Sequence, residues 1–264
     1  MDGSQSEWLL YTIQYLLQLD DRILTDCWDS LNFEQQIFLL EVLSSIPTAN
    51  SSKFQILHIY CRMTSQFFDP LNFSTTDNSR SQFFALFDIV TKFLCDFYSV
   101  EDADSRNLRN MSIAENIFGK TVKLLSEIQK LCREQHPLFK IDKNISEISG
   151  NLSAKRLFHG LKQNLVNLIA NISYKCPKIQ HKGFELEAIY LILDCTKLDP
   201  NNPFLTQWAI LAIRNLLENC AENQTLVNQM KANSIADGLD EEFFQKLNVA
   251  PMLNPNGKVV FAKK

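Results

Sequence analysis

A segment of the chain occurs twice, and this repeat limits the possible folds more than any other feature. Residues 161–180 align with residues 205–224 at an offset of 44. A further shift of 44 brings apolar residues of 121–132 over the same positions, so that cysteine recurs at 132, 176 and 220. The identical pairs of the first alignment are Leu161/Leu205, Gln163/Gln207, Ile169/Ile213, Asn171/Asn215, Cys176/Cys220 and Gln180/Gln224.

A period of this length, with apolar residues at helical spacing, is typical of armadillo and HEAT repeats. One such unit cannot bury its apolar face alone, and stacked units share a continuous core. The repeat therefore predicts an all-α fold, namely an armadillo/HEAT-like α-solenoid, a right-handed superhelix of stacked helices. The most apolar segment, 203–219, is expected to be an inner helix that packs on both neighbours.

The scarcity of turn residues also favours long helices, since the chain has only 7 Gly and 8 Pro. In the helix at 203–219, Pro203 suits the first turn, with Asn201 or Asn202 as the cap. The apolar periodicity predicts helices at 5–19, 20–30, 33–46, 52–68, 81–98, 111–135, 153–175, 183–197, 203–219, 222–236 and 239–247.

Polar stretches divide the chain. Residues 69–80 and 99–107 are predicted loops, and 136–151 is a candidate hinge. The predicted organisation is an N-terminal helical region (1–150), C-terminal repeats (151–238), and a capping helix with a tail (239–264). Within the tail, Asn256-Gly257 is a turn signal before the strand-like KVVF, which indicates a hairpin with APML or a mobile end.

Composition excludes several classes of protein. The formal net charge is −4 with no basic stripe, so nucleic acid is not an expected partner. The N-terminus lacks the basic region of a signal peptide, and no apolar run is long enough to span a membrane. We therefore expect a cytoplasmic protein without membrane insertion. The seven cysteines lack C-x-x-C spacing and mostly lie in apolar runs, which predicts buried thiols rather than disulfides or zinc ligands.

The C-terminal third of the chain resembles the ataxin-10 family. The resemblance covers roughly residues 155–236 and rests on NLIANISYKC, IYLILDCTKLDP and NNPFLTQWAILAIRNLLENCAENQ. It implies an armadillo-like α-solenoid in a non-enzymatic cytoplasmic protein that works through other proteins. It also implies self-association through this region, with roles in neuron survival, neurite growth and cytokinesis. Residues 1–150 resemble the family only in their helix pattern.

Two asparagines are candidate binding residues. Asn171 and Asn215 occupy equivalent positions of the repeat. In many armadillo proteins an asparagine of this kind faces the concave groove and binds the backbone of an extended peptide through its amide. A peptide pocket also needs a Trp one turn earlier, where this chain has Asn167 and Leu211. The alternative, which we favour, is that both amides bond backbone groups between neighbouring helices.

Two aromatic residues near the start of the second repeat are further candidates for protein binding. Trp208 is expected in the core, or as an interface anchor if it is exposed. Phe204 of NNPF is expected to fasten the loop to the helix below, and NNPF with Asp199 to form a helix cap and rigid corner or, alternatively, a partner-recognition loop. The Phe pairs at 67–68, 83–84 and 243–244 are expected in the core, the last pair as a cap on the final repeat.

No pattern of catalytic or metal-binding residues occurs. The four histidines (58, 136, 159 and 181) lack metal spacing, and nucleophile, phosphate-binding and dinucleotide motifs are missing. We therefore expect no enzyme activity and no cofactor. The favoured function is a protein-interaction scaffold that binds other proteins and forms homo-oligomers. The alternatives are a receptor for extended peptides that uses the asparagine ladder, and an enzyme of unrecognised type.

Overall fold

The fold is described from a computed structural model. It describes residues 11–12, 15, 26–45, 50–67, 78–101, 103–136, 160–197, 199, 202–230 and 248–263. The chain forms two compact units, Met1–Cys220 and Ala221–Lys264. The first unit holds the two repeats up to Cys220, and the second holds one helix and a hairpin.

The described residues are mostly helical, which confirms the all-α prediction apart from one small sheet. The second unit contains α14 (Ala221–Gln229), β1 (Val249–Leu253) and β2 (Val259–Lys263). The first unit contains a short 3-10 helix, η1, and nine helices that the structure describes with their bounds. These are η1 (Trp28–Ser30), α3 (Phe33–Ser45), α4 (Asn50–Gln66), α6 (Asn78–Ser99), α7 (Ala103–Arg109), α8 (Ser112–Arg133), α10 (Leu161–Ser173), α11 (Pro177–Glu185), α12 (Ala188–Asp194) and α13 (Leu205–Leu217).

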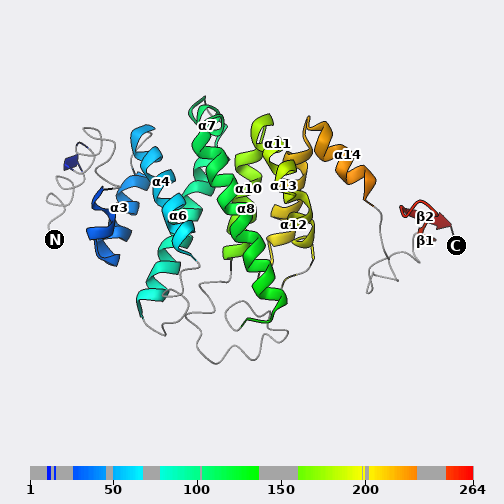
Figure 1. Cartoon of the computed structure of the whole chain (residues 1–264), viewed down its shortest axis with the longest axis horizontal. Coiled ribbons are helices and arrows are strands. Elements are labelled where there is room, and N and C mark those ends of the chain that lie inside the picture. Colours follow the sequence, from blue (N-terminus) through cyan, green and yellow to red (C-terminus); the bar gives the residue numbers. More distant parts are fainter. Residues whose placement is uncertain are drawn as a thin grey trace. The chain divides into compact units, whose positions relative to one another are not determined.

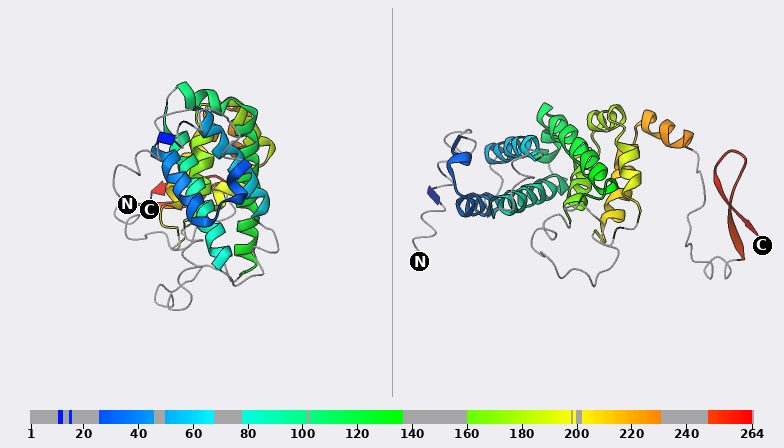
Figure 2. Two further views of the ribbon diagram at one scale, coloured as in Figure 1. Left: turned by 90° about the vertical axis from the view of Figure 1, so that its left-hand side faces the viewer. Right: turned by 60° about the horizontal axis from the view of Figure 1, so that its bottom comes forward.

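Three helices of the first unit form a row. Helix α10 packs against α6 on one side and α13 on the other. Helix α8 lies beside the row and contacts α4, α10, α11 and α12. The helices succeed one another in chain order from α3 to α13, as Figure 1 and the two further views of Figure 2 show. We call α6, α10 and α13 the row helices.

The row helices are apolar because each is covered on more than one side. In α10 the side chains of Leu165, Val166, Leu168, Ile169 and Ile172 are fully buried. The core continues toward the N-terminus through an aromatic cluster between α4 and α6. Phe67 and Phe84 lie in it as expected, together with Phe87, and the ring centroids of Phe67 and Phe87 are 5.1 Å apart.

The predicted equivalence of residues 121–132 with the two later segments is wrong. Residues 121–132 lie in α8, beside the row, whereas α6 occupies the place before α10. The sequence period misses α6 because the connections differ in length. Asn171 bonds a residue of α6 that is 76 positions away, while Asn215 bonds a residue of α10 only 45 positions away.

Two further predictions about secondary structure are wrong. Residues 99–107 were expected to form a loop, but α7 begins at Ala103 and buries Leu108 and Arg109. The single helix expected at 183–197 is two helices. The chain breaks at Leu186 and Glu187, and Glu187 has a positive φ of 52°, which ends the helical path.

The hairpin predicted for the tail is confirmed in the second unit. Strands β1 and β2 are antiparallel, and Met252 lies opposite Val260. The turn uses Asn254, whose side-chain oxygen accepts hydrogen bonds from the backbone of Asn256 and Lys258. Gly257 has a φ of 71°, a conformation that glycine adopts without strain.

Several predictions fall outside the described residues. These are the hinge beyond His136, the helix at 239–247, and the capping role of Phe243 and Phe244. The domain boundaries at 150/151 and 238/239 also stay predictions. Among the helices that the structure describes, none combines the length and the apolar character needed to cross a membrane.

Candidate protein-interaction site

Asn171 and Asn215 both link neighbouring row helices. The Asn215 amide donates to the carbonyl oxygen of Ala170 at 2.8 Å, and the Asn171 amide donates to that of Cys95 at 3.0 Å. Asn215 is buried and Asn171 is half-buried. The Asn171 amide also donates to Asn167, the position where a peptide pocket would need Trp. These contacts favour the structural alternative, and a role of the two asparagines in partner binding stays a prediction.

A second polar link joins the C-terminal ends of the row helices. Arg109, at the end of α7, is buried and donates to Tyr98 and, at 3.2 Å, to the carbonyl oxygen of Asn171. Gln180 of α11 makes the corresponding link between the next two row helices, α10 and α13. Its amide donates to the carbonyl oxygen of Asn215 at 2.9 Å and to that of Ser173 at 3.3 Å. Both side chains donate to carbonyl groups near a helix end, which lack the donor that the next helical turn would supply.

Sequence reasoning missed these two bridging residues. Gln180 carries a weak signal, since it recurs as Gln224 in the alignment. Arg109 carries none, because it lies in the stretch expected to be a loop and its partner Asn171 is 62 residues away. The role of Arg109 therefore depends on the packing of α7 against α6 and α8, which no local pattern encodes.

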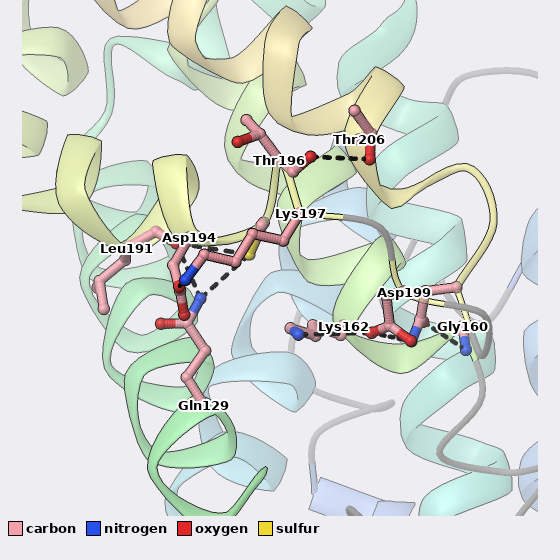
Figure 3. A network of polar contacts seen from close by, with 11 residues as sticks. Gln129, Gly160, Lys162, Leu191, Asp194, Thr196, Lys197, Asp199 and Thr206 are labelled. Carbon is pink, nitrogen blue, oxygen red and sulfur yellow. Dashed lines mark hydrogen bonds and ion pairs between the residues drawn. The ribbon is translucent and has the colours of Figure 1, made fainter. Parts of the chain in front are cut away.

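The NNPF corner is fastened to the start of α10 (Figure 3). The side-chain oxygen of Asn202 accepts a hydrogen bond from the backbone of Gly160 at 2.9 Å, and its amide donates to Asp199. Asp199 also pairs with Lys162 at 3.5 Å, and the two side chains are only 7% and 13% exposed. The predicted rigid corner agrees with these bonds. The predicted helix cap is not found, because α13 begins at Leu205 and no side chain caps its first turn.

Gln129 joins α8 to α12 in the same region (Figure 3). Its amide donates to the carbonyl oxygen of Leu191 at 2.8 Å and to the Cys195 sulfur at 3.1 Å. Burial raises the pKa of the Cys195 thiol to about 11. Burial also raises the pKa of the Cys95 thiol. Raised values keep both thiols protonated near neutral pH, so neither has the thiolate that a catalytic cysteine needs.

The exposed side of α13 carries the other two candidate residues. Phe204 is 55% exposed, and its roles in fastening the loop and in binding a partner stay predictions. Trp208 is half-buried, between the predicted core and anchor positions. Ile210, which sequence reasoning did not single out, is 59% exposed. Together these side chains give α13 an apolar surface that a protein partner could cover.

A groove of about 690 Å³ lies between α8 and the α11–α12 corner. Its lining includes Gly119, Leu186 and Leu191, together with lysines and glutamates. The mixture of charges selects no particular ligand. Among the described residues, no group of three or more His, Cys, Asp or Glu side chains is placed to hold a metal ion.

Comparison with known proteins identifies the part of the chain that contains α10 to α13. Residues 161–262 match the family described as the spinocerebellar ataxia type 10 protein domain. This segment belongs to the ataxin-10 family. The resemblance seen in the sequence is thereby confirmed, and the matched ataxin-10 segment extends beyond residue 236 through most of the hairpin.

Individual ataxin-10 proteins give the same result. Ataxin-10 of Xenopus tropicalis is 47% identical over 78 residues, which is 30% of this chain and 16% of that protein. Ataxin-10 of Homo sapiens is 40% identical over 118 residues, or 43% of this chain and 25% of that protein. Ataxin-10 of Bos taurus is 34% identical over 149 residues, or 56% and 31%. The chain thus spans less than a third of the length of these relatives. No solved structure matches it.

Proposed function

We propose that this chain is a non-enzymatic protein-interaction scaffold of the ataxin-10 type, built as an armadillo-like α-solenoid. One observation carries the proposal. The same pair of polar links, an asparagine to the preceding row helix and a bridging side chain at the helix ends, joins α6 to α10 and α10 to α13. Repetition of one contact between successive layers is what a solenoid requires.

The repeated links also support a non-enzymatic role. The polar side chains that sequence analysis singled out, Asn171 and Asn215, bond backbone carbonyls of neighbouring helices. They therefore hold layers together and do not converge on a common point as catalytic groups do. An experimental structure tests the architecture. Row helices α6, α10 and α13 should follow one another by a constant right-handed rotation, and unrelated orientations would overturn the solenoid.

The proposal includes self-association through the C-terminal repeats, which the family resemblance implies. Purified chain should have a molar mass above that of the monomer at micromolar concentration, measured by multi-angle light scattering. Dilution should return it toward the monomer mass, since association follows mass action. A monomer mass at every concentration would remove self-association from the proposal.

The cellular role is proposed from the same resemblance. It consists of a cytoplasmic function in neuron survival and neurite growth and in cytokinesis, exerted through partner proteins. Depletion of the protein should increase the fraction of binucleate cells, and re-expression should reverse the increase. Normal division and normal neurite length after complete depletion would contradict this part.

A further inference from the structure

A cavity of about 210 Å³ lies among the first helices of the chain, outside the segment that matches the ataxin-10 domain. Residues of η1, α3, α4 and α6 line it. Drug-sized ligands occupy cavities of roughly 300–1,000 Å³, so this one suits a single side chain or a group of that size. The polar links between the row helices use none of the lining residues, so the stacking of layers does not account for the cavity.

Three aromatic side chains line the cavity, each from a different element. They are Trp28 of η1, Phe33 at the start of α3 and Phe83 of α6. Trp28 is only 3% exposed, and the other two are half-buried. The ring centroid of Phe83 also lies 6.3 Å from that of Phe67, in the aromatic cluster between α4 and α6. Packing against the protein thus holds these rings in place before any ligand binds, and we call the three the aromatic walls.

The polar part of the lining favours a positively charged occupant. Among the described residues that line the cavity, Asp29 alone carries a charge. The amide nitrogen of Gln36 donates to the carbonyl oxygen of Trp28 at 2.8 Å, which leaves the Gln36 side-chain oxygen as the end that can meet a ligand. A carboxylate, an amide oxygen and the faces of aromatic rings all present negative charge, and each attracts a cation.

We propose that this cavity binds the methylated ammonium group of a lysine side chain from a partner protein. Aromatic walls of this kind attract quaternary ammonium groups through their ring faces. They also select the methylated form. The walls, Met63 and Leu86 accept no strong hydrogen bond, so the N–H groups of an unmodified lysine would lose their bonds to water there. Methyl groups lose no such bond and gain dispersion contacts.

Arg62 of α4 competes with the ligand for Asp29. The two side chains form an ion pair and are 44% and 57% exposed, respectively. A ligand cation beside Asp29 is repelled by the Arg62 guanidinium, because like charges repel. Removing the charge of Arg62 should therefore tighten the binding of a cation, weaken that of an anion and leave that of a neutral group unchanged. The direction of the effect thus reports the charge of the ligand.

The probe is a short alanine peptide with one trimethyllysine, titrated into the full chain by isothermal titration calorimetry. It should bind with a dissociation constant of about 1 mM or lower, which a group of this size can reach. The same peptide with unmodified lysine should bind at least about tenfold more weakly. A peptide in which a neutral tert-butyl group replaces the trimethylammonium group should be weakened to a similar extent. Choline, which has the same head group without the peptide, should also bind more weakly than the trimethyllysine peptide.

Matched variants locate the binding site. Phe33→Leu removes one aromatic wall and should weaken binding at least about fivefold. Phe38→Leu makes the same change on the same helix, at a residue that is 43% exposed and outside the lining, and should have no effect. Asp29→Asn should weaken binding, and Arg62→Gln should tighten it, each by about twofold to fivefold. The gain in Arg62→Gln cannot result from partial unfolding, so it tests the site even if Phe33→Leu is unstable.

Several results would overturn the inference. One is the absence of binding by the trimethyllysine peptide at 10 mM, about ten times the expected dissociation constant. Equal binding of the tert-butyl peptide would show an apolar cavity that does not select a cation. Unchanged binding in both Phe33→Leu and Arg62→Gln would place the peptide elsewhere on the chain. Tighter binding of choline than of the peptide would assign the cavity to a small molecule and not to a partner protein. None of these results bears on the scaffold role, which depends on the stacked layers of the other helices.

Discussion

The side-chain amide of Asn215 donates a hydrogen bond to the backbone carbonyl of Ala170 at 2.8 Å, across the contact between α13 and α10. Both residues are buried, so no water replaces the bond when it is broken. Asn215→Ala leaves the carbonyl of Ala170 without this donor and should lower the free energy of unfolding by about 1–3 kcal/mol. Urea unfolding followed by circular dichroism measures the change.

Asn171 provides the matched comparison. Its bond to Cys95 has nearly the same length, but the side chain is half-buried. Asn171→Ala should therefore be less destabilising than Asn215→Ala, because the bond that it removes is only part-buried. If both variants unfold like the parent chain but lose binding to a partner, the asparagine ladder would be a peptide site after all.

The bridge made by Arg109 gives the second prediction. Its guanidinium donates to Tyr98, Val100 and Asn171, at the ends of two row helices. Arg109→Met removes all three bonds and should lower the free energy of unfolding by about 3 kcal/mol or more. Arg109→Lys should recover little of it, because an ammonium group cannot span three carbonyls as the planar guanidinium does.

Arg106 supplies the control for this prediction. It lies on the same short helix and is exposed. Arg106→Met should change the free energy of unfolding by less than about 0.5 kcal/mol in the same urea experiment. Equal effects of Arg106→Met and Arg109→Met would mean that loss of positive charge on α7, rather than the bridge, destabilises the chain.

The sequence predicts the equivalence of α10 and α13, because equal lengths of chain follow the start of each of these helices. Residues 161–176 and 205–220 occupy corresponding places in the row of helices, and even their turns agree, since Lys175 and Asn219 both have a positive φ, of 49° and 57°. The hairpin is predictable for a similar reason, because its turn and strands are short and local. Periodicity therefore succeeds where one contact repeats at constant spacing.

The features that sequence reasoning missed depend on packing between distant segments. Helix α7 has seven residues, too few to show apolar periodicity, and is held by burial of Leu108 and Arg109. The break at Glu187 requires a non-glycine residue in a left-handed conformation, which no residue pattern signals.

Two glycines make a matched pair for the third prediction. A β-carbon added at Gly183 would lie 2.7 Å from Leu216 Cδ2 and 3.5 Å from Phe118 Cζ, both of buried side chains. A β-carbon at Gly119 would meet Leu186 Cδ1 at 3.9 Å, an ordinary contact. Gly119→Ala should stabilise the chain by about 0.5–1 kcal/mol, because alanine favours the helix. Gly183→Ala should instead destabilise it by about 1 kcal/mol or more through overpacking.

Thermal melts of the two glycine variants give the readout. The two substitutions are the same chemically and both lie within helices, so a difference in sign between them isolates the packing of α11 on α8 and α13. A melting temperature for Gly183→Ala at or above that of Gly119→Ala would show that Leu216 moves aside freely, and that this contact between layers is loosely packed.

The Cys195 thiol gives a prediction about alkaline pH. Burial raises its pKa to about 11, against about 8.5 for a thiol in an unfolded chain. Below pH 8 the thiol is protonated in both states and has no effect on the pH dependence. Between these two values only the unfolded chain releases the proton, so the free energy of unfolding falls as pH rises, by about 3 kcal/mol in all.

Cys195→Ala should remove this share of the alkaline loss. Urea unfolding of both chains at pH 8, 9, 10 and 11 measures it, with Ile192→Val, a fully buried neighbour on α12, as the control. The difference between the parent chain and Ile192→Val should stay constant with pH, whereas the advantage of the parent chain over Cys195→Ala should shrink or reverse. A constant difference for both variants would show that the thiol ionises in the folded chain as readily as in the unfolded one.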